Sequence, residues 1–336
     1  MKICVSGSHG FIGGYLVQEL LNDNHHVIGI DNFSKYGELN KQFESNKNFS
    51  LYNFDIKDSK KLYEILSDCD HFIAGAAMIG GISYFHEYAY DLLAENERIL
   101  ASSFDAAIKA FQNDRLKKIT VISSSMVFEN SKTFPTPEGD ELNSPPPFST
   151  YGFQKLSSEF FCRGAFQQYK LPYTIIRPFN CVGIGEYQSS EDHEIYSGNV
   201  KLALSHVVPD FIVKSLVKQN PFRILGNGNQ TRCFTYGGDI AKGIAMTLEN
   251  QNALNNDFNI SIDKETNIQD LAKLIWNKVN PNMPINIHYD RGFDHDVQKR
   301  IPNIEKAKKL LNFEAKTDLI QIIDELINWI KVNYKY

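Results

Sequence analysis

A tyrosine and a lysine that could share a proton lie four residues apart in "YGFQK", at Tyr151 and Lys155. Residues four apart share one face of a helix, and the preceding run "SPPPFST" is typical of a turn before a helix. A phenol ordinarily ionises near pH ~10 and needs a nearby positive charge to act as a base at neutral pH. The ammonium group one turn away supplies such a charge. The alternative is an ordinary surface pair.

A run of three serines is the second candidate group, Ser123 to Ser125 in "VISSSMVF". These residues follow an apolar segment that we expect to be a buried parallel strand. Polar residues after such a strand emerge at the carboxyl edge of the sheet, where ligands bind in open α/β sheets. A serine hydroxyl at that edge can share a substrate's proton with the tyrosine and orient it. The sequence therefore predicts a serine, tyrosine and lysine site.

The glycine run "GSHGFIG" predicts a dinucleotide site at the first junction between a strand and a helix. Gly7, Gly10 and Gly13 let the turn tighten, let backbone N–H groups approach a pyrophosphate and let the helix pack on the strand. The spacing is G-x-x-G-x-x-G rather than the commoner G-x-G-x-x-G, so the surrounding elements carry the argument. The alternative is three turn glycines followed by a helix-capping aspartate.

Asp31 follows at the end of the next expected strand and favours NAD over NADP. A carboxylate there can accept hydrogen bonds from both ribose hydroxyls and would repel a 2′-phosphate. Asn32 is placed to assist it, and Asp55, at the end of the third expected strand, is placed to meet the adenine amino group. Oxidised nicotinamide is positively charged and would also lower the pKa of the tyrosine. We expect NAD as cofactor and no metal.

Strand patterns alternate with helix patterns along the first half of the chain, and this order predicts the fold that positions these residues. Expected strands cover 2–7, 25–31, 49–55, 70–77, 117–125 and 172–180, and expected helices cover 11–23, 58–68, 90–112 and a segment from residue 150. This order indicates an α/β fold, a Rossmann-like doubly wound parallel sheet. We expect the NAD-binding domain over 1–180 and a smaller, mixed α/β substrate lobe over 181–336. Some C-terminal segments should return to the first domain.

Composition limits the class of protein. The chain has 336 residues, 42% hydrophobic content and a net charge of -5 with both signs scattered, which argues against a nucleic-acid partner. No segment is long and apolar enough to suggest a membrane span, and "MKICVSGSHG" enters a strand at once, so we expect neither a signal peptide nor a membrane partner. Five widely spaced cysteines form no CxxC pair, so reduced thiols and a cytoplasmic location are expected.

Taken together, these motifs resemble the extended short-chain dehydrogenase/reductases of the NAD-dependent nucleotide-sugar epimerase/dehydratase group. The resemblance runs almost end to end and rests on eight segments. They are "GSHGFIG", "DN" at 31–32, "AGAA" at 74–77, "SSSMVF", "YGFQK", "RPFNCVG", "GNGNQTRCFTYGGD" at 226–239 and "DVQKRIPNIEKAKKLLNF" at 296–313. The group implies a nucleotide-sugar substrate for the C-terminal lobe.

The resemblance also implies a role for individual residues. Tyr151 would be the acid/base, Lys155 its activator and a ribose ligand, and Ser124 the active-site hydroxyl. Planar guanidinium groups suit paired phosphate oxygens. The expected substrate ligands are Ser125, Met126, Asn180, Arg232 and Arg300, and the expected cofactor ligands are Gly7, Gly10, Phe11, Ile12, Gly13, Asp31, Asn32, Asp55, Ile56, Ala74, Ala76, Tyr151 and Lys155.

Met126 discriminates between the reactions of the group. Related dehydratases and decarboxylases carry a glutamate in this region, and 3,5-epimerases place a catalytic cysteine at this position. Methionine cannot transfer a proton, so the remaining serine, tyrosine, lysine and NAD favour 4-epimerisation through a transient 4-keto sugar. The alternatives are a dehydratase, a keto-sugar reductase or a catalytically silent NAD-binding subunit.

Several features leave two interpretations open. Gly80 and Gly81 could make room for the sugar or could be turn residues. The group also implies a homodimer in which the helices near 90–112 and 151–169 form a four-helix bundle, whereas a monomer would use those apolar faces in its own core. His206 could lie near the nucleotide base or be an ordinary packed histidine, and His86 and Glu87 could reach the sugar. The run Glu191, Asp192, His193 and Glu194 resembles a metal cluster only superficially, and we expect a solvated loop there.

Overall fold

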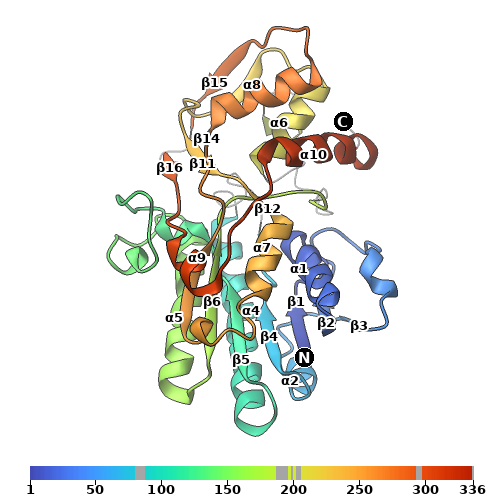
Figure 1. Cartoon of the computed structure of the whole chain (residues 1–336), viewed down its shortest axis with the longest axis vertical. Coiled ribbons are helices and arrows are strands. Elements are labelled where there is room, and N and C mark those ends of the chain that lie inside the picture. The colour runs from blue at the N-terminus through green and yellow to red at the C-terminus, as the bar shows by residue number, and fades with distance from the viewer. Residues whose placement is uncertain (80–87, 187–195, 198–199, 202–205, 293–296, 335–336) are drawn as a thin grey trace.

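A parallel sheet of seven strands forms the centre of the computed structural model (Figure 1). The structure describes residues 1–79, 88–186, 196–197, 200–201, 206–292 and 297–334. Every neighbouring pair in this sheet is parallel. From one edge to the other the strands are β13 (Asn256–Ile260), β6 (Tyr173–Pro178), β5 (Lys118–Ile122), β4 (His71–Ala74), β1 (Lys2–Ser6), β2 (His26–Asp31) and β3 (Phe49–Asn53).

The strand order reverses between β1 and β4, because the chain runs outward from β1 to β3 and then returns to the other side of β1. In open α/β sheets a ligand-binding crevice lies at such a reversal, beyond the carboxyl ends of the strands. The residues that follow β1, β4 and β5 therefore surround one place. The doubly wound α/β fold that the sequence predicts is confirmed.

Helices cover both faces of the sheet, since each face is apolar. On one face α1 (Phe11–Asn22), α7 (Gly237–Ala245) and α9 (Glu305–Leu311) bury an apolar core that includes Ile3 and Val5. On the other face α2 (Ser59–Leu66), α4 (Ala89–Asn113) and α5 (Thr150–Tyr169) pack over a second core. Strands buried on both sides read as continuous apolar runs, which is why the sequence predicts them well.

A smaller group of strands and helices lies above the carboxyl edge of the sheet in Figure 1. Its helices are α6 (Val207–Leu216), α8 (Ile268–Val279) and α10 (Leu319–Asn333), which share a separate apolar core. Its strands are β10 (Phe222–Leu225) with β15 (Ile287–Asp290), and β11 (Thr231–Cys233) between β14 (Glu265–Asn267) and β16 (Lys299–Arg300). Four two-residue strands form two further pairs, β7 (Cys181–Val182) with β12 (Thr235–Tyr236) and β8 (Tyr196–Ser197) with β9 (Val200–Lys201).

The chain passes between these two parts more than once. After β6 it enters the upper part, and it then returns to add α7, β13 and later α9 to the sheet-bearing part. Several expected strands are shorter than their patterns suggest: β3 ends at Asn53, β4 at Ala74 and β5 at Ile122. Of the described helices, none has the length and apolar character to cross a membrane.

Candidate active site

The start of α5 holds the tyrosine and lysine. Ser149 caps this helix, because its hydroxyl accepts a hydrogen bond of 3.0 Å from the backbone N–H of Gly152. Tyr151 and Lys155 are both buried, and the Lys155 Nζ lies 5.9 Å from the centroid of the tyrosine ring. The same Nζ donates a 2.9 Å hydrogen bond to the carbonyl oxygen of Ile122, the last residue of β5. The two groups therefore lie on one helix face, against the end of a central strand.

Ser124 meets the tyrosine from the strand side. It has an extended backbone (φ -157°, ψ 154°) and caps η2 (Ser125–Phe128), a short 3-10 helix, by accepting a 3.2 Å hydrogen bond from the N–H of Met126. Its hydroxyl also hydrogen-bonds to Tyr151. The structure thus brings together the three residues that the sequence predicts as catalytic.

Burial dominates the ionisation of this pair. Burial raises the pKa of the Tyr151 phenol, although the Ser124 hydrogen bond and the charge of Arg300 oppose that increase. Burial also lowers the pKa of the Lys155 ammonium, to about 8. The protein alone therefore disfavours both charged forms, and a further positive charge beside the phenol is needed to form phenolate readily at neutral pH.

The glycine run makes a tight junction between β1 and α1. Gly7 has a φ of +72°, a left-handed conformation that suits glycine. A Cβ atom on Gly13 would lie 1.9 Å from the carbonyl oxygen of Gly7, so only glycine lets the helix approach the turn this closely. Gly10 is the N-cap of α1, which begins at Phe11, next to Ile12. This leaves the first backbone N–H groups of α1 available to an anion such as a pyrophosphate.

Asp31 and Asp55 both fasten loops at the carboxyl edge. The Asp31 carboxylate accepts hydrogen bonds of 2.9 Å from the backbone N–H groups of His9 and Phe33, joining the glycine loop to the end of β2. Asp55 lies two residues beyond β3, accepts a 2.9 Å hydrogen bond from the N–H of Lys57 and pairs with its ammonium group at 3.3 Å. The N-caps of α1 and α2 are instead Gly10 and Asp58, so the helix-capping alternative for Asp31 is wrong. Each of the two carboxylates still has lone pairs for a ligand.

The remaining expected cofactor residues lie around the same edge. The exposed Asn32 accepts a 3.1 Å hydrogen bond from the N–H of Ser34. Ile56 is buried in the core, while Ala74 ends β4 and Ala76 follows it. Sequence patterns missed Ser6, whose hydroxyl accepts hydrogen bonds of 3.1 and 3.2 Å from the N–H groups of Gly75 and Ala76. A polar residue closing an apolar strand was the signal available.

The residues expected to bind substrate lie where the upper part meets this edge. Arg300 on β16 directly neighbours Arg232 on β11, so two guanidinium groups come from paired strands. One guanidinium nitrogen of Arg300 lies 3.5 Å from the Asn180 side-chain oxygen, and another lies 2.6 Å from the Met126 sulfur. The Asn180 amide also donates a 3.1 Å hydrogen bond to the Cys233 carbonyl.

An apolar cluster lines the other side of Tyr151. Met126 and Leu92 are buried against the tyrosine, and Ile79 and Val297 pack on this group. The neighbouring Ser125 is buried as well. Met126 therefore offers an apolar surface, not a proton donor, beside the phenol.

Of the residues with two open interpretations, the structure describes His206 but not the others. His206 lies 2.6 Å from a Glu186 carboxylate oxygen, and its ring lies near that of Phe11. Asn96 of α4 is a buried residue that the motifs did not reveal; its side chain makes two hydrogen bonds to the Met78 backbone, of 2.7 and 2.8 Å. Interpretations of Gly80, Gly81, His86, Glu87 and residues 191–194 fall outside the described residues.

Comparisons with known proteins agree with this geometry. A model of the NAD dependent epimerase/dehydratase family matches residues 3–261. A UDP-N-acetyl-alpha-D-glucosaminuronate decarboxylase from Bacillus cytotoxicus is 28% identical over 340 residues, covering 98% of each chain. The UDP-glucose 4-epimerase of Thermotoga maritima, solved with UDP-glucose, is 26% identical with a TM-score of 0.81, and 99% of each chain is covered. The UDP-glucuronic acid 4-epimerase of Bacillus cereus, solved with UDP-glucuronic acid and NAD, is 25% identical with a TM-score of 0.80, covering 99% of this chain and all of its own.

Proposed function

Because the chain belongs to the NAD dependent epimerase/dehydratase family, we propose that it inverts a nucleotide sugar at C4 through a transient 4-keto sugar. The observation that carries this proposal is the buried group of Ser124, Tyr151 and Lys155, with Met126 beside it. With a bound nicotinamide as hydride carrier, this group would support oxidation and reduction at one carbon. Elimination or decarboxylation in the family employs further acid or base groups near this position, and a thioether supplies none.

Each residue has a distinct task in this mechanism. Tyr151 takes the proton from the C4 hydroxyl and later returns it, and Ser124 orients that hydroxyl through its contact with the phenol. Lys155 stabilises the phenolate while its ammonium is protonated, which with a pKa of about 8 holds at neutral pH. Bound NAD would supply reversible hydride transfer at C4, and the site would have to let the keto sugar present its other face before the hydride returned.

The residues at the carboxyl edge fit a dinucleotide. The close approach of Gly13 to Gly7 and the open N-terminus of α1 suit a pyrophosphate, and Asp31 suits an adenosine ribose without a 2′-phosphate. We assign Phe11, Ile12, Asn32, Asp55, Ile56, Ala74 and Ala76 to the walls of this site. We assign Arg232, Arg300 and Asn180 to the substrate diphosphate and sugar, with Ser125 and Met126 beside the ring. Because similar proteins act on UDP-sugars, UDP-hexoses are the first substrates to test.

We also propose that the protein is a cytoplasmic homodimer that pairs α4 and α5 across a two-fold axis. Large apolar side chains remain exposed on these two helices: Tyr90 on α4, and Phe153 and Phe160 on α5. Phe153 and Phe160 are seven residues apart and therefore share a face. Light scattering should give twice the chain mass of 38.3 kDa, and Phe160→Glu should halve it.

The test of the reaction uses the purified protein directly. Nucleotide released by denaturation is analysed first, because an epimerase keeps its NAD through the cycle. The same preparation is then incubated with UDP-hexoses and UDP-hexuronic acids in deuterium oxide, and the products are analysed by mass spectrometry and NMR.

Bound NAD and a C4 epimer of unchanged mass support the proposal, since the hydride returns to the carbon that it left. Loss of water or carbon dioxide would assign the chain to the dehydratases or decarboxylases instead. Deuterium at a carbon beside C4 would indicate 3,5-epimerisation, and a requirement for added NADH or NADPH would indicate a reductase.

A further inference from the structure

A third side chain of α5 extends the catalytic helix face by one turn. Tyr151, Lys155 and Glu159 follow one another at intervals of four residues, so all three point to the same side. Each contacts the last residue of β5 or one of the two residues that follow it: Tyr151 meets Ser124, Lys155 donates to the Ile122 carbonyl, and Glu159 accepts a 2.7 Å hydrogen bond from the Ser123 hydroxyl. Three consecutive residues at the end of this strand are therefore held by one face of one helix.

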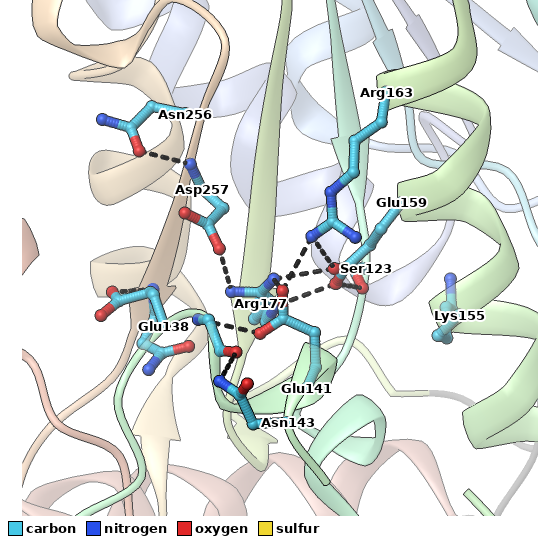
Figure 2. Close-up of polar contacts among 12 residues, drawn as sticks. Ser123, Glu138, Glu141, Asn143, Lys155, Glu159, Arg163, Arg177, Asn256 and Asp257 are labelled. Carbon is cyan, nitrogen blue, oxygen red and sulfur yellow. Dashed lines mark hydrogen bonds and ion pairs between the residues drawn. The ribbon is translucent and has the colours of Figure 1, made fainter. Parts of the chain in front are cut away.

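Glu159 is completely buried and held in one orientation (Figure 2). One carboxylate oxygen accepts from the Ser123 hydroxyl and from Arg177 Nε at 2.8 Å, and the other accepts from Arg177 Nη2 at 2.7 Å. Arg163, one turn further along α5, lies 3.5 Å from the second oxygen. A bidentate arginine fixes both the position and the plane of a carboxylate. The acceptor for Ser123 is thus preorganised.

Arg177 on β6 is itself surrounded by carboxylates. Its guanidinium meets Glu159, Glu141 at 2.9 Å and Asp257 of β13 at 2.6 Å, and it lies over the Phe128 ring at 5.1 Å. Burial alone would raise the pKa of Asp257, but the charge of Arg177 and a hydrogen bond from Lys306 hold it below its ordinary value. A charge network that is paired and buried in this way is costly to rearrange.

Hydrogen bonds hold both the backbone and the side chain of Ser123. The Ser123 N–H donates a 2.8 Å hydrogen bond to the Ile176 carbonyl on β6, while its hydroxyl reaches Glu159 on α5. The next residue, Ser124, leaves the sheet toward Tyr151. Of the three contacts, those of Tyr151 and Lys155 involve proposed catalytic groups. Ser123 and Glu159 have no proposed role in the reaction itself.

We propose that Ser123 and Glu159 are positioning residues that hold Ser124 against the Tyr151 phenol, with Arg177 fixing Glu159. This inference rests on the proposed function for its effect on rate, but the geometry of the phenol can be measured independently. Its consequence is that removal of the Ser123 hydroxyl loosens Ser124 and weakens proton transfer without touching substrate or cofactor. A purely structural role would change stability alone.

The test compares Ser123→Ala with Ser103→Ala as a matched control. Ser103 is equally buried, and its hydroxyl donates a 2.7 Å hydrogen bond to Ile99 within α4. Loss of one hydrogen bond to a charged group corresponds to about tenfold in rate. We expect Ser123→Ala to lower kcat about tenfold with KM and bound NAD unchanged, Ser123→Thr to recover most of it, and Ser103→Ala to leave kcat unchanged.

A second readout does not depend on turnover. With tyrosine labelled at Cζ, NMR titration follows the 16 phenols, and Tyr151→Phe assigns the signal. Because the Ser124 hydrogen bond opposes the increase in the Tyr151 pKa, Ser123→Ala should raise that pKa and Ser103→Ala should not. Equal kcat and equal Tyr151 pKa in the two alanine variants would overturn the proposal. A wild-type protein without epimerase activity would refute the proposed function, while the titration would still decide the positioning role.

Discussion

The ammonium group of Lys155 lies 2.9 Å from the carbonyl oxygen of Ile122, at the end of the strand that leads to the serines. This contact places the cation in a buried position one helical turn from Tyr151. Burial lowers the pKa of Lys155 to about 8, which is close to neutral pH. The charge that we propose to stabilise the phenolate is therefore lost at moderately alkaline pH.

Lys155 should impose an alkaline limit on hydride transfer. Its pKa is lowered, so the ammonium is charged below about pH 8 and neutral above it. We expect the single-turnover rate of NADH formation, followed by absorbance, to fall as the pH rises through that value. In Lys155→Arg the guanidinium stays protonated, so the rate should be lower throughout but should show no such fall. The same alkaline fall in both proteins would assign it to another group.

Gly13 and Gly14 offer a matched pair of substitutions in one helix. A Cβ on Gly13 would overlap the Gly7 carbonyl oxygen, whereas a Cβ on Gly14 would meet the Lys41 Nζ only at 3.9 Å. Gly13→Ala should lower the free energy of unfolding by about 1–3 kcal/mol and remove bound NAD. Gly14→Ala should leave NAD in place and be neutral or stabilising by up to about 1 kcal/mol. Thermal denaturation and nucleotide release measure both; equal behaviour would mean that the tight junction is not required.

The sequence predicts the sheet well because its central strands are buried on both faces and its helices are strongly patterned. The expected helix over 90–112 is found as α4, with one residue more at each end. β13 escaped prediction because "NDFNI" contains residues that strands disfavour, and only its pairing with β6 makes it a strand. Several expected strands also extend past the observed strand ends, since the patterns that predict them continue into the loops that follow.

The candidate site, like the fold, is only partly predictable from the sequence. Short-range patterns, such as the Tyr–Lys spacing and the glycine run, are visible in the sequence and lie together at the carboxyl edge. Contacts between distant segments are not visible: Arg177 meets Asp257 eighty positions later, and Glu159 meets Ser123 thirty-six positions earlier. Such pairs require the fold, because each residue alone reads as an ordinary charged or polar side chain.

Asp31 should decide between NAD and NADP. Its carboxylate joins the glycine loop to the end of β2 and would repel a 2′-phosphate. Calorimetric titration of the NAD-free protein should show that Asp31→Asn narrows the preference for NAD over NADP by at least about tenfold, or about 1.4 kcal/mol. Asp55→Asn is the control, because a residue near adenine should affect both cofactors equally. An unchanged preference in Asp31→Asn would remove this residue from the ribose site.

Met126 should tolerate a change of shape better than a change of charge. Its side chain packs on Leu92 and Tyr151 and touches the Arg300 guanidinium, so a carboxylate here would pair with Arg300 and face the phenol. We expect Met126→Leu to keep kcat/KM within about threefold, since the two side chains have similar volumes. Met126→Glu should raise KM for the nucleotide sugar by more than about tenfold, because it would draw Arg300 away from the diphosphate contact that we propose. It should also move the Tyr151 limb of the pH profile to higher pH, because a negative charge disfavours phenolate. Met126→Gln, which is neutral and of similar size to glutamate, separates charge from shape: if it matches Met126→Glu in KM and in pH profile, the charge argument fails and steric fit controls this position.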